Sequence, residues 1–244
     1  MTQLGRSTTI RGLFLGVLVL TATSWTQTRP PIVEQLAKTY GLDAFGQIEA
    51  IRYTFNAQFP GVNVSRSWVW EPKTDHVSYE GNDKDGKPVK VSYVRSQLNS
   101  APATVKDDID PAFVNDQYNL LFPLFVYWNY SADVQDLGRQ QLPLGKGSGT
   151  RVVVKYPPEA GAYSPRDTWE LYVGSDDRVE EFVYHRGGST KPSVVIATWT
   201  GYKKAGPLLI STDRRGTADG EPLRVFFSDV SVKLVGSDTW VTAQ

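Results

Sequence analysis

The sequence of 244 residues contains no cysteine and only two histidines. The lack of cysteine excludes disulfides, thiolate metal ligands, cysteine nucleophiles and a lipid attached through cysteine. His76 and His185 lie far apart, and no H-E-x-x-H pattern occurs, so we predict no metal site and no cofactor. Lys and Arg together number 26, as do Asp and Glu, and this balance favours neither nucleic acid nor an acidic membrane as a partner.

Long apolar runs are also scarce, and the main one lies near the start of the chain. Arg6 and Arg11 precede the uncharged run "GLFLGVLVL", and the small residues "TATS" follow it. This layout is typical of a secretory signal peptide, here residues 1–24, and the run is shorter than a membrane span. An uncleaved anchor is the alternative. We expect a mature chain, 25–244, that is periplasmic or secreted and has no integral membrane span.

Two helices are predicted from apolar spacing and from proline and glycine signals. Apolar residues recur on one face between Pro31, which suits the first position of a helix, and Gly41, which suits its end. A second helix is expected from Pro111 to about Leu121, with Asp110 as its N-cap. Pro123 should end or kink this second helix.

Most of the remaining chain shows the period-two alternation of β-strands and is rich in aromatic residues, with 7 Trp, 12 Tyr and 10 Phe. The turn "NDKDGK" between two alternating segments predicts a hairpin. Hairpin spacing implies an antiparallel sheet of about 10–11 strands, too wide to stay flat, which should curl around two or three helices. The expected strands are 51–56, 65–70, 76–79, 89–93, 151–156, 168–173, 179–185, 193–202, 206–212, 223–230 and 230–235, with a short one around Trp240.

No local motif identifies a set of catalytic residues. The nucleophile pattern G-x-S-x-G is absent, and "GKGSGT" precedes a predicted strand, whereas a phosphate-binding loop precedes a helix. "NDKDGK" lacks the ligand spacing of a calcium loop and is explained by the hairpin. The uncharged stretch Leu120–Trp128 is too short for a membrane helix and contains a proline, so it either fills the hollow of the sheet or lines a cavity there.

Several segments resemble LolA-like proteins, the periplasmic carriers of outer-membrane lipoproteins. "TWTGYKKAGPLLISTDRRG", "LRVFFSDVSVKL" and "SDTW" are similar to the closing strands of that superfamily, and "AFGQIEAIRYTFNAQ" and "SWVWEPKTDHVSY" are similar to its first strands. The likeness covers the layout of roughly 32–241. It implies one α+β domain over 25–244: a single curved antiparallel sheet that forms an incomplete β-barrel, with helices on the concave side and an apolar cavity that takes acyl chains.

The resemblance also implies which side chains line that cavity. Carried over by position, the ligand-lining residues are aromatic or aliphatic side chains of the strands and of the helical plug: Trp68, Trp70, Tyr93, Phe122, Phe125, Trp128, Trp169 and Leu171.

Three functions remain open at this point. The preferred one is an exported non-enzymatic protein that binds a lipid or another hydrophobic small molecule, with an envelope protein as a further candidate partner. The second is an exported hydrolase or isomerase with a dispersed active site, for which His185 and Glu181 are the first candidates because they share one strand face. The third is an envelope structural or interaction module with a solid interior and an exposed apolar patch.

Overall fold

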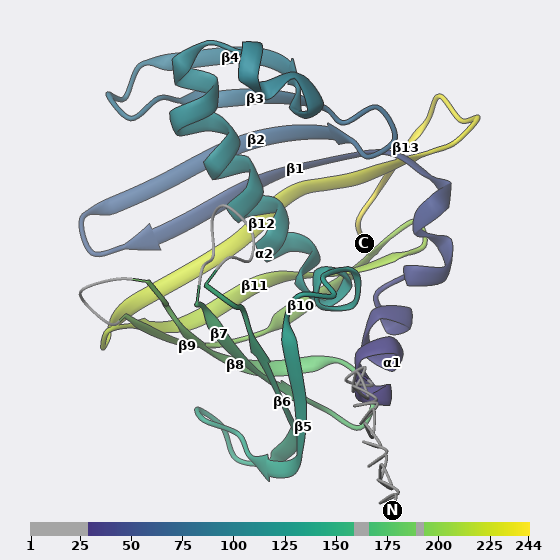
Figure 1. The fold of residues 1–244 in the computed structure, drawn as a ribbon, viewed down its shortest axis with the longest axis vertical. Helices are drawn as coiled ribbons and strands as arrows, with labels where there is room; N and C mark the ends of the chain where they lie inside the picture. Colours follow the sequence, from purple (N-terminus) through teal and green to yellow (C-terminus); the bar gives the residue numbers. More distant parts are fainter. Residues whose placement is uncertain (1–28, 159–165, 189–192) are drawn as a thin grey trace, which may run out of the picture.

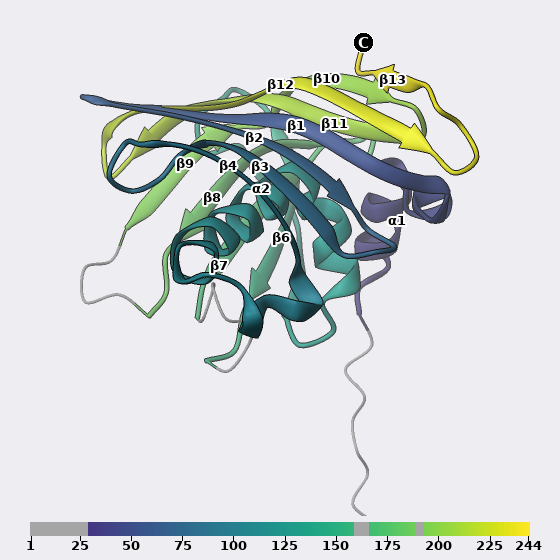
Figure 2. The ribbon, with the colours of Figure 1, turned by 90° about the horizontal axis from the view of Figure 1, so that it is seen from above.

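The computed structural model describes residues 29–158, 166–188 and 193–244. The predicted signal peptide, 1–24, lies outside the described residues. Thirteen strands of the described part form one antiparallel sheet that curves over the helices (Figures 1 and 2). The sheet does not close, because β4 and β5 form its two free edges. The predicted α+β class with a single curved, open antiparallel sheet is therefore confirmed.

The strand order across the sheet is β4-β3-β2-β1-β12-β11-β9-β8-β7-β6-β5, while β10 pairs with β11 and β13 pairs with β12. The helices are α1 (Pro31–Thr39) and α2 (Asp110–Trp128), with the short helical turns η1 (Leu42–Gln47), η2 (Arg95–Ser100) and η3 (Val105–Ile109). The strands are β1 (Ile48–Phe59), β2 (Val62–Glu71), β3 (His76–Asn82), β4 (Pro88–Val94), β5 (Asp133–Gln141), β6 (Ser148–Lys155), β7 (Thr168–Val173), β8 (Val179–His185), β9 (Val194–Thr198), β10 (Thr200–Ala205), β11 (Leu208–Ala218), β12 (Glu221–Leu234) and β13 (Trp240–Thr242).

Helix α1 begins and ends where the sequence predicts. It starts at Pro31, buries Val33 and Leu36, and stops before Gly41, whose φ of 101° is left-handed. A Cβ on Gly41 would lie 2.6 Å from the backbone oxygen of Pro207. Glycine is therefore required at this position both for the backbone angle and for the close approach of the neighbouring chain.

Helix α2 crosses the concave side of the sheet and is longer than predicted, because Pro123 kinks the helix and does not end it. The irregular residue is Leu121, with φ −114° and ψ 21°, two positions before the proline. A proline has no amide hydrogen, so the carbonyl of Asn119, four residues earlier, lacks its helical partner. This carbonyl is hydrogen-bonded by a side chain from the sheet.

The start of α2 differs from the prediction that Asp110 acts as an N-cap. A short π-helical turn, η3, leads directly into α2, whose first residue is Asp110. Both Asp110 and the preceding Ile109 have helical backbone angles, so Asp110 lies inside a continuous helical segment and is not its cap. Its buried carboxylate accepts hydrogen bonds from the Tyr93 hydroxyl at 2.9 Å and from Arg95 Nε at 2.7 Å. Asp110 therefore joins α2 to the edge strand β4 and the turn that follows it.

The strands differ from the prediction in their division as well as in their bounds. The edge strand β5 was not anticipated, the expected strand 193–202 is divided at Trp199 into β9 and β10, and the two expected strands within 223–235 form the single strand β12. Trp199 turns the chain because its indole is buried and its amide donates to the carbonyl of Glu180 at 2.7 Å. Strand β9 consequently pairs with β8 and with the last residues of β11, whereas β10 pairs only with the first part of β11.

Aromatic side chains fill much of the space between α2 and the sheet. Phe122 of α2 packs against Trp169 of β7 with ring centroids 4.4 Å apart, and Trp68 of β2 packs against Phe113 at 5.4 Å. The apolar stretch Leu120–Trp128 thus belongs to the helix that plugs the concave side. None of the helices in the described ranges is long and apolar enough to cross a membrane.

Candidate functional site

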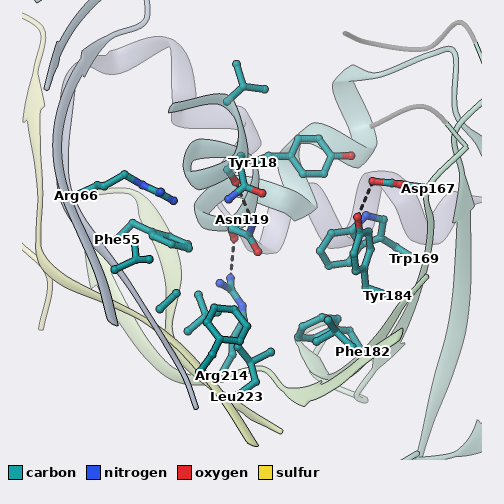
Figure 3. Close-up of a pocket in the computed structure, with 17 residues that line it drawn as sticks. Phe55, Arg66, Tyr118, Asn119, Asp167, Trp169, Phe182, Tyr184, Arg214 and Leu223 are labelled. Atoms are coloured by element: carbon teal, nitrogen blue, oxygen red, sulfur yellow. Dashed lines mark hydrogen bonds between the residues drawn. The ribbon is translucent and has the colours of Figure 1, made fainter. Parts of the chain in front are cut away.

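A cavity of about 300 Å3 lies between α2 and the concave face of the sheet (Figure 3). This volume is at the lower end of the range for small-molecule sites, which is about 300–1,000 Å3. The helix contributes Val114, Asn115, Tyr118 and Asn119 to its wall, and strands from both halves of the sheet contribute the rest. The aromatic packing beneath α2 is therefore incomplete at this place.

Strand register places apolar side chains side by side in the cavity wall. Successive inward positions of β1 are Phe55 and Ala57, and Ala57 is paired with Val225 of β12. Leu223 is the next inward residue of β12, and Phe182 of β8 faces them from the other half of the sheet (Figure 3). Because the side-chain period of a strand is two, alternation along β1 and β12 alone is enough to build this apolar wall.

One polar group at the cavity is a complete ion pair between α2 and β2. Arg66 donates from Nε and Nη2 to the two carboxylate oxygens of Asp116 at 2.7 and 2.6 Å, and Trp68 Nε1 donates to the same carboxylate at 2.9 Å. Burial raises the pKa of Asp116, and the hydrogen bonds and charge of Arg66 oppose that rise. The pair holds the first half of α2 against the sheet.

A second polar group lies on the opposite wall, where Asp167 accepts one side-chain and one backbone hydrogen bond from the described residues. The Tyr184 hydroxyl donates to one carboxylate oxygen at 2.9 Å, and the amide of Gly187 donates to the other at 2.7 Å. Burial, followed by the neighbouring charge of Asp167, raises the pKa of Tyr184. Tyr184 therefore stays protonated at neutral pH and serves as a donor.

Arg214 of β11 is the third polar group and is 1% exposed. Its Nη2 donates to the carbonyl of Asn119 at 2.7 Å, the carbonyl that Pro123 leaves without a helical partner. Its guanidinium carbon lies 3.7 Å from the ring centroid of Trp199. Among the described residues, Nε and Nη1 have no hydrogen-bond partner. Burial lowers the pKa of Arg214 to about 9.

The structure distributes the eight predicted ligand-lining residues over three environments. Trp169 lines the cavity. Trp70, Phe125 and Trp128 line a different, more open depression near η1. The other four are core side chains with exposures of 8% or less: Trp68, Tyr93, Phe122 and Leu171. A role of any of the eight in ligand binding stays a prediction.

Most residues around the cavity were not identified from the sequence as lining residues. Phe55 and Phe182 lie on predicted strands, but β1 and β8 do not pair, and the curvature of the sheet that brings the two rings to one cavity was not derivable from either strand alone. Arg214 lies beyond the predicted end of its strand at Thr212. Arg214 could have been found by extending the alternation of this strand: it lies six residues, an even number, after Leu208, so both side chains lie on the same inward face.

The histidine and glutamate proposed for a dispersed active site lie away from the cavity. His185 Nε2 is 3.2 Å from Glu170 Oε1, and Glu181 accepts a hydrogen bond from the amide of Leu144 at 2.6 Å. Both side chains occupy the face of β8 opposite to Phe182 and Tyr184, which line the cavity. Across the described ranges, no group of three or more His, Cys, Asp or Glu side chains is arranged to hold a metal ion.

Comparisons with known proteins identify similar structures and no family. No family model matches the chain, and no curated protein matches it. A crystal structure of a DUF1329 family protein from Desulfovibrio piger has a TM-score of 0.46 and 11% identity, over 86% of this chain and 96% of that chain. The Mycobacterium tuberculosis lipoprotein LppX has a TM-score of 0.28 and 10% identity, over 82% of this chain and 95% of that one. The cavity itself therefore carries the functional inference.

Proposed function

We propose that the chain is an exported, non-enzymatic protein that binds a lipid or another hydrophobic small molecule in the cavity beneath α2. The observation that carries the proposal is the cavity of about 300 Å3, with rings and aliphatic side chains over most of its wall. Since a water molecule occupies about 30 Å3, the cavity holds about ten groups of methylene size, which corresponds to one short acyl chain. Export, and membership of the LolA-like superfamily, belong to the same proposal and rest on the sequence patterns.

An apolar rim supports uptake from outside. Phe59 lines the cavity and is 40% exposed, and Val62, on the other side of the β1–β2 turn, is 50% exposed. Exposed apolar side chains at the mouth of an apolar cavity provide a continuous apolar surface that an acyl chain can contact as it enters. Arg66 and Asp116 tie α2 over this space, so displacement of α2 would release a bound molecule.

The test is calorimetric titration of the purified chain with 1-octanol, a neutral ligand of the expected size. Burial of about eight methylene-sized groups at about 0.8 kcal/mol each gives about 6 kcal/mol, or a dissociation constant on the order of tens of micromolar. A cavity-filling substitution, Val225→Trp, should abolish this binding. The same substitution at Val235, which is 53% exposed and does not line the cavity, is the control and should leave binding unchanged.

If the chain is instead an interaction module with a solid interior, it should not bind octanol. Such a protein gives no heat with octanol at two well-separated temperatures, a comparison that reveals binding whose enthalpy is near zero at one of them. Its mass in native spectrometry after purification from its own envelope equals that of the bare chain. Unchanged octanol affinity in Val225→Trp would show that any binding occurs elsewhere, and would remove the cavity from the proposal.

A further inference from the structure

Arg214 is the one described side chain of the cavity whose charge and hydrogen-bonding capacity are largely unused. Strand β11 presents it on the concave face, where it is paired in register with Val225 of β12. Figure 3 shows its guanidinium directed from the floor of the cavity toward Asn119. Nε and Nη1, which carry most of the N–H groups of a guanidinium, are buried and lack partners among the described residues.

The other charged groups of the cavity are satisfied. Arg66 is paired with both oxygens of Asp116, so that guanidinium is neutralised by a carboxylate in bidentate geometry. Asp167 accepts hydrogen bonds from Tyr184 and Gly187. In contrast, no ion pair joins Arg214 to a carboxylate in the part of the chain that the structure describes. The Tyr118 hydroxyl and Trp169 Nε1 of the cavity wall also lack partners among the described residues, but both groups are neutral, so the unmet charge requirement of the cavity is for an anion.

The contact with Asn119 accounts for only part of the guanidinium. That contact satisfies the carbonyl left free by Pro123, and it engages Nη2 alone. A single neutral donor would satisfy the same carbonyl without burying a charge. The rings of Trp199 and Phe227 also contact the guanidinium, but they give Nε and Nη1 no hydrogen-bond acceptor. A buried cation in this position is costly unless an anion completes its hydrogen bonds.

We propose that Arg214 binds the carboxylate of a single-chain amphiphile whose acyl chain occupies the apolar part of the cavity. This inference rests on the proposed function and adds the chemical class of the ligand. A planar carboxylate matches the fork of a guanidinium and carries the one negative charge that Arg214 requires. The ligand therefore enters with its headgroup inward, because Arg214 is 1% exposed whereas Phe59 at the rim is 40% exposed.

The chain of the ligand follows the apolar wall from Arg214 toward the rim. Val225 and Ala57 lie beside Arg214 across the paired strands, and Leu223 and Phe59 continue the same surface outward. A chain of about eight to ten carbons fills the volume, on the basis of about 30 Å3 for each water-sized group.

The experiment compares three ligands of equal chain length, octanoate, 1-octanol and octylammonium, by calorimetric titration of the wild-type chain at about pH 7.5. Because a hydrogen-bonded charge contributes more than a neutral contact, octanoate should bind about ten- to a hundredfold more tightly than octanol, and octylammonium should bind more weakly than either. In Arg214→Met the preference for octanoate should disappear while octanol still binds. Arg139→Met removes an exposed positive charge away from the cavity and should retain the preference.

The outcomes separate this inference from the proposed function. If none of the three ligands binds, the proposed function itself is wrong, whereas binding of octanoate alone supports both proposals. If octanol binds and octanoate binds no more tightly, the cavity is a ligand site but Arg214 does not select an anion. The wild-type comparison decides between these results without any variant, so the inference stays testable even if Arg214→Met does not fold.

Discussion

Arg214→Met should make the unliganded protein more stable. The substitution replaces a fully buried cation by an apolar side chain of similar length. Burial lowers the pKa of Arg214 from 12.5 to about 9. At about 1.4 kcal/mol for each pH unit, the folded state carries an electrostatic cost of about 5 kcal/mol at neutral pH, which methionine removes.

Two favourable contacts of Arg214 are lost at the same time. The contact with the Trp199 ring contributes about 2 kcal/mol in a desolvated site. Removal of the donor to Asn119 leaves a buried carbonyl unsatisfied at a cost of about 1 kcal/mol. The balance is a gain of about 2 kcal/mol in the free energy of unfolding, or about 4–8 °C in Tm for a chain of this size.

The assay is urea unfolding followed by tryptophan fluorescence. Since the folded pKa of Arg214 is lower than its unfolded pKa, the cost is fully present below about pH 9 and decreases as the pH rises above that value. The gain in Arg214→Met should therefore be larger at pH 7 than at pH 10. The matched control is Arg66→Met, which leaves the buried carboxylate of Asp116 without its cation and should cost about 3–5 kcal/mol. Equal losses of stability in the two variants would refute the reasoning.

Three further predictions concern other parts of the fold. Burial opposes the ionisation of Asp213, but the hydrogen bonds and charges of Arg224 and Arg215 outweigh burial and lower the pKa of Asp213. The ionised carboxylate therefore stabilises the fold at neutral pH, and this stabilisation is lost as the pH falls below the ordinary pKa of 3.8. Asp213→Asn should lower the free energy of unfolding by about 1–2 kcal/mol in urea titrations at pH 7 and by much less at pH 2. Gly41→Ala should lower the unfolding free energy by about 1–3 kcal/mol, whereas Gly46→Ala, where a Cβ meets nothing within 4 Å, should be neutral in the same titration. Tyr184→Phe should lower Tm by a few degrees, because Asp167 loses its hydroxyl donor, and scanning calorimetry measures the change.

Short sequence patterns were sufficient to predict the elements whose conformation depends mainly on neighbouring residues in the chain. Pro31 and Gly41 bound α1 because each restricts the backbone irrespective of the surroundings. Alternation over Ile51, Tyr53 and Phe55 predicts a half-buried strand, and β1 buries these three side chains on one face. Curvature follows from the number of strands, since a wide antiparallel sheet twists.

Tertiary pairing determined the elements that were missed. Strand β5, "DVQDLGRQQ", has few apolar residues because it is an edge strand that pairs with β6 on one side only. Polar edge strands resist further pairing, and for the same reason they lack the apolar alternation by which strands are recognised. The break at Trp199 depends on its contact with β8, a segment that the local sequence does not contain.

The boundary between core and cavity was also beyond the reach of the sequence. Phe122 and Trp169 touch each other, yet only Trp169 lines the cavity. Both are large aromatic residues packed between α2 and the sheet, so the residue type does not distinguish a core position from a lining position. Composition therefore indicated a ring-rich interior, while the space left open within it follows from the placement of the kinked helix.

The kink of α2 and the charge of Arg214 are parts of one arrangement. Pro123 removes the amide that would bond Asn119, and the resulting free carbonyl accepts a side chain from the sheet. A neutral donor would suffice for that purpose, whereas the guanidinium adds a buried charge that the unliganded fold must carry. A carboxylate that binds Arg214 compensates this charge only in the folded state, so it stabilises the fold by mass action. The same ligand should therefore raise the Tm of the wild type by more than it raises the Tm of Arg214→Met.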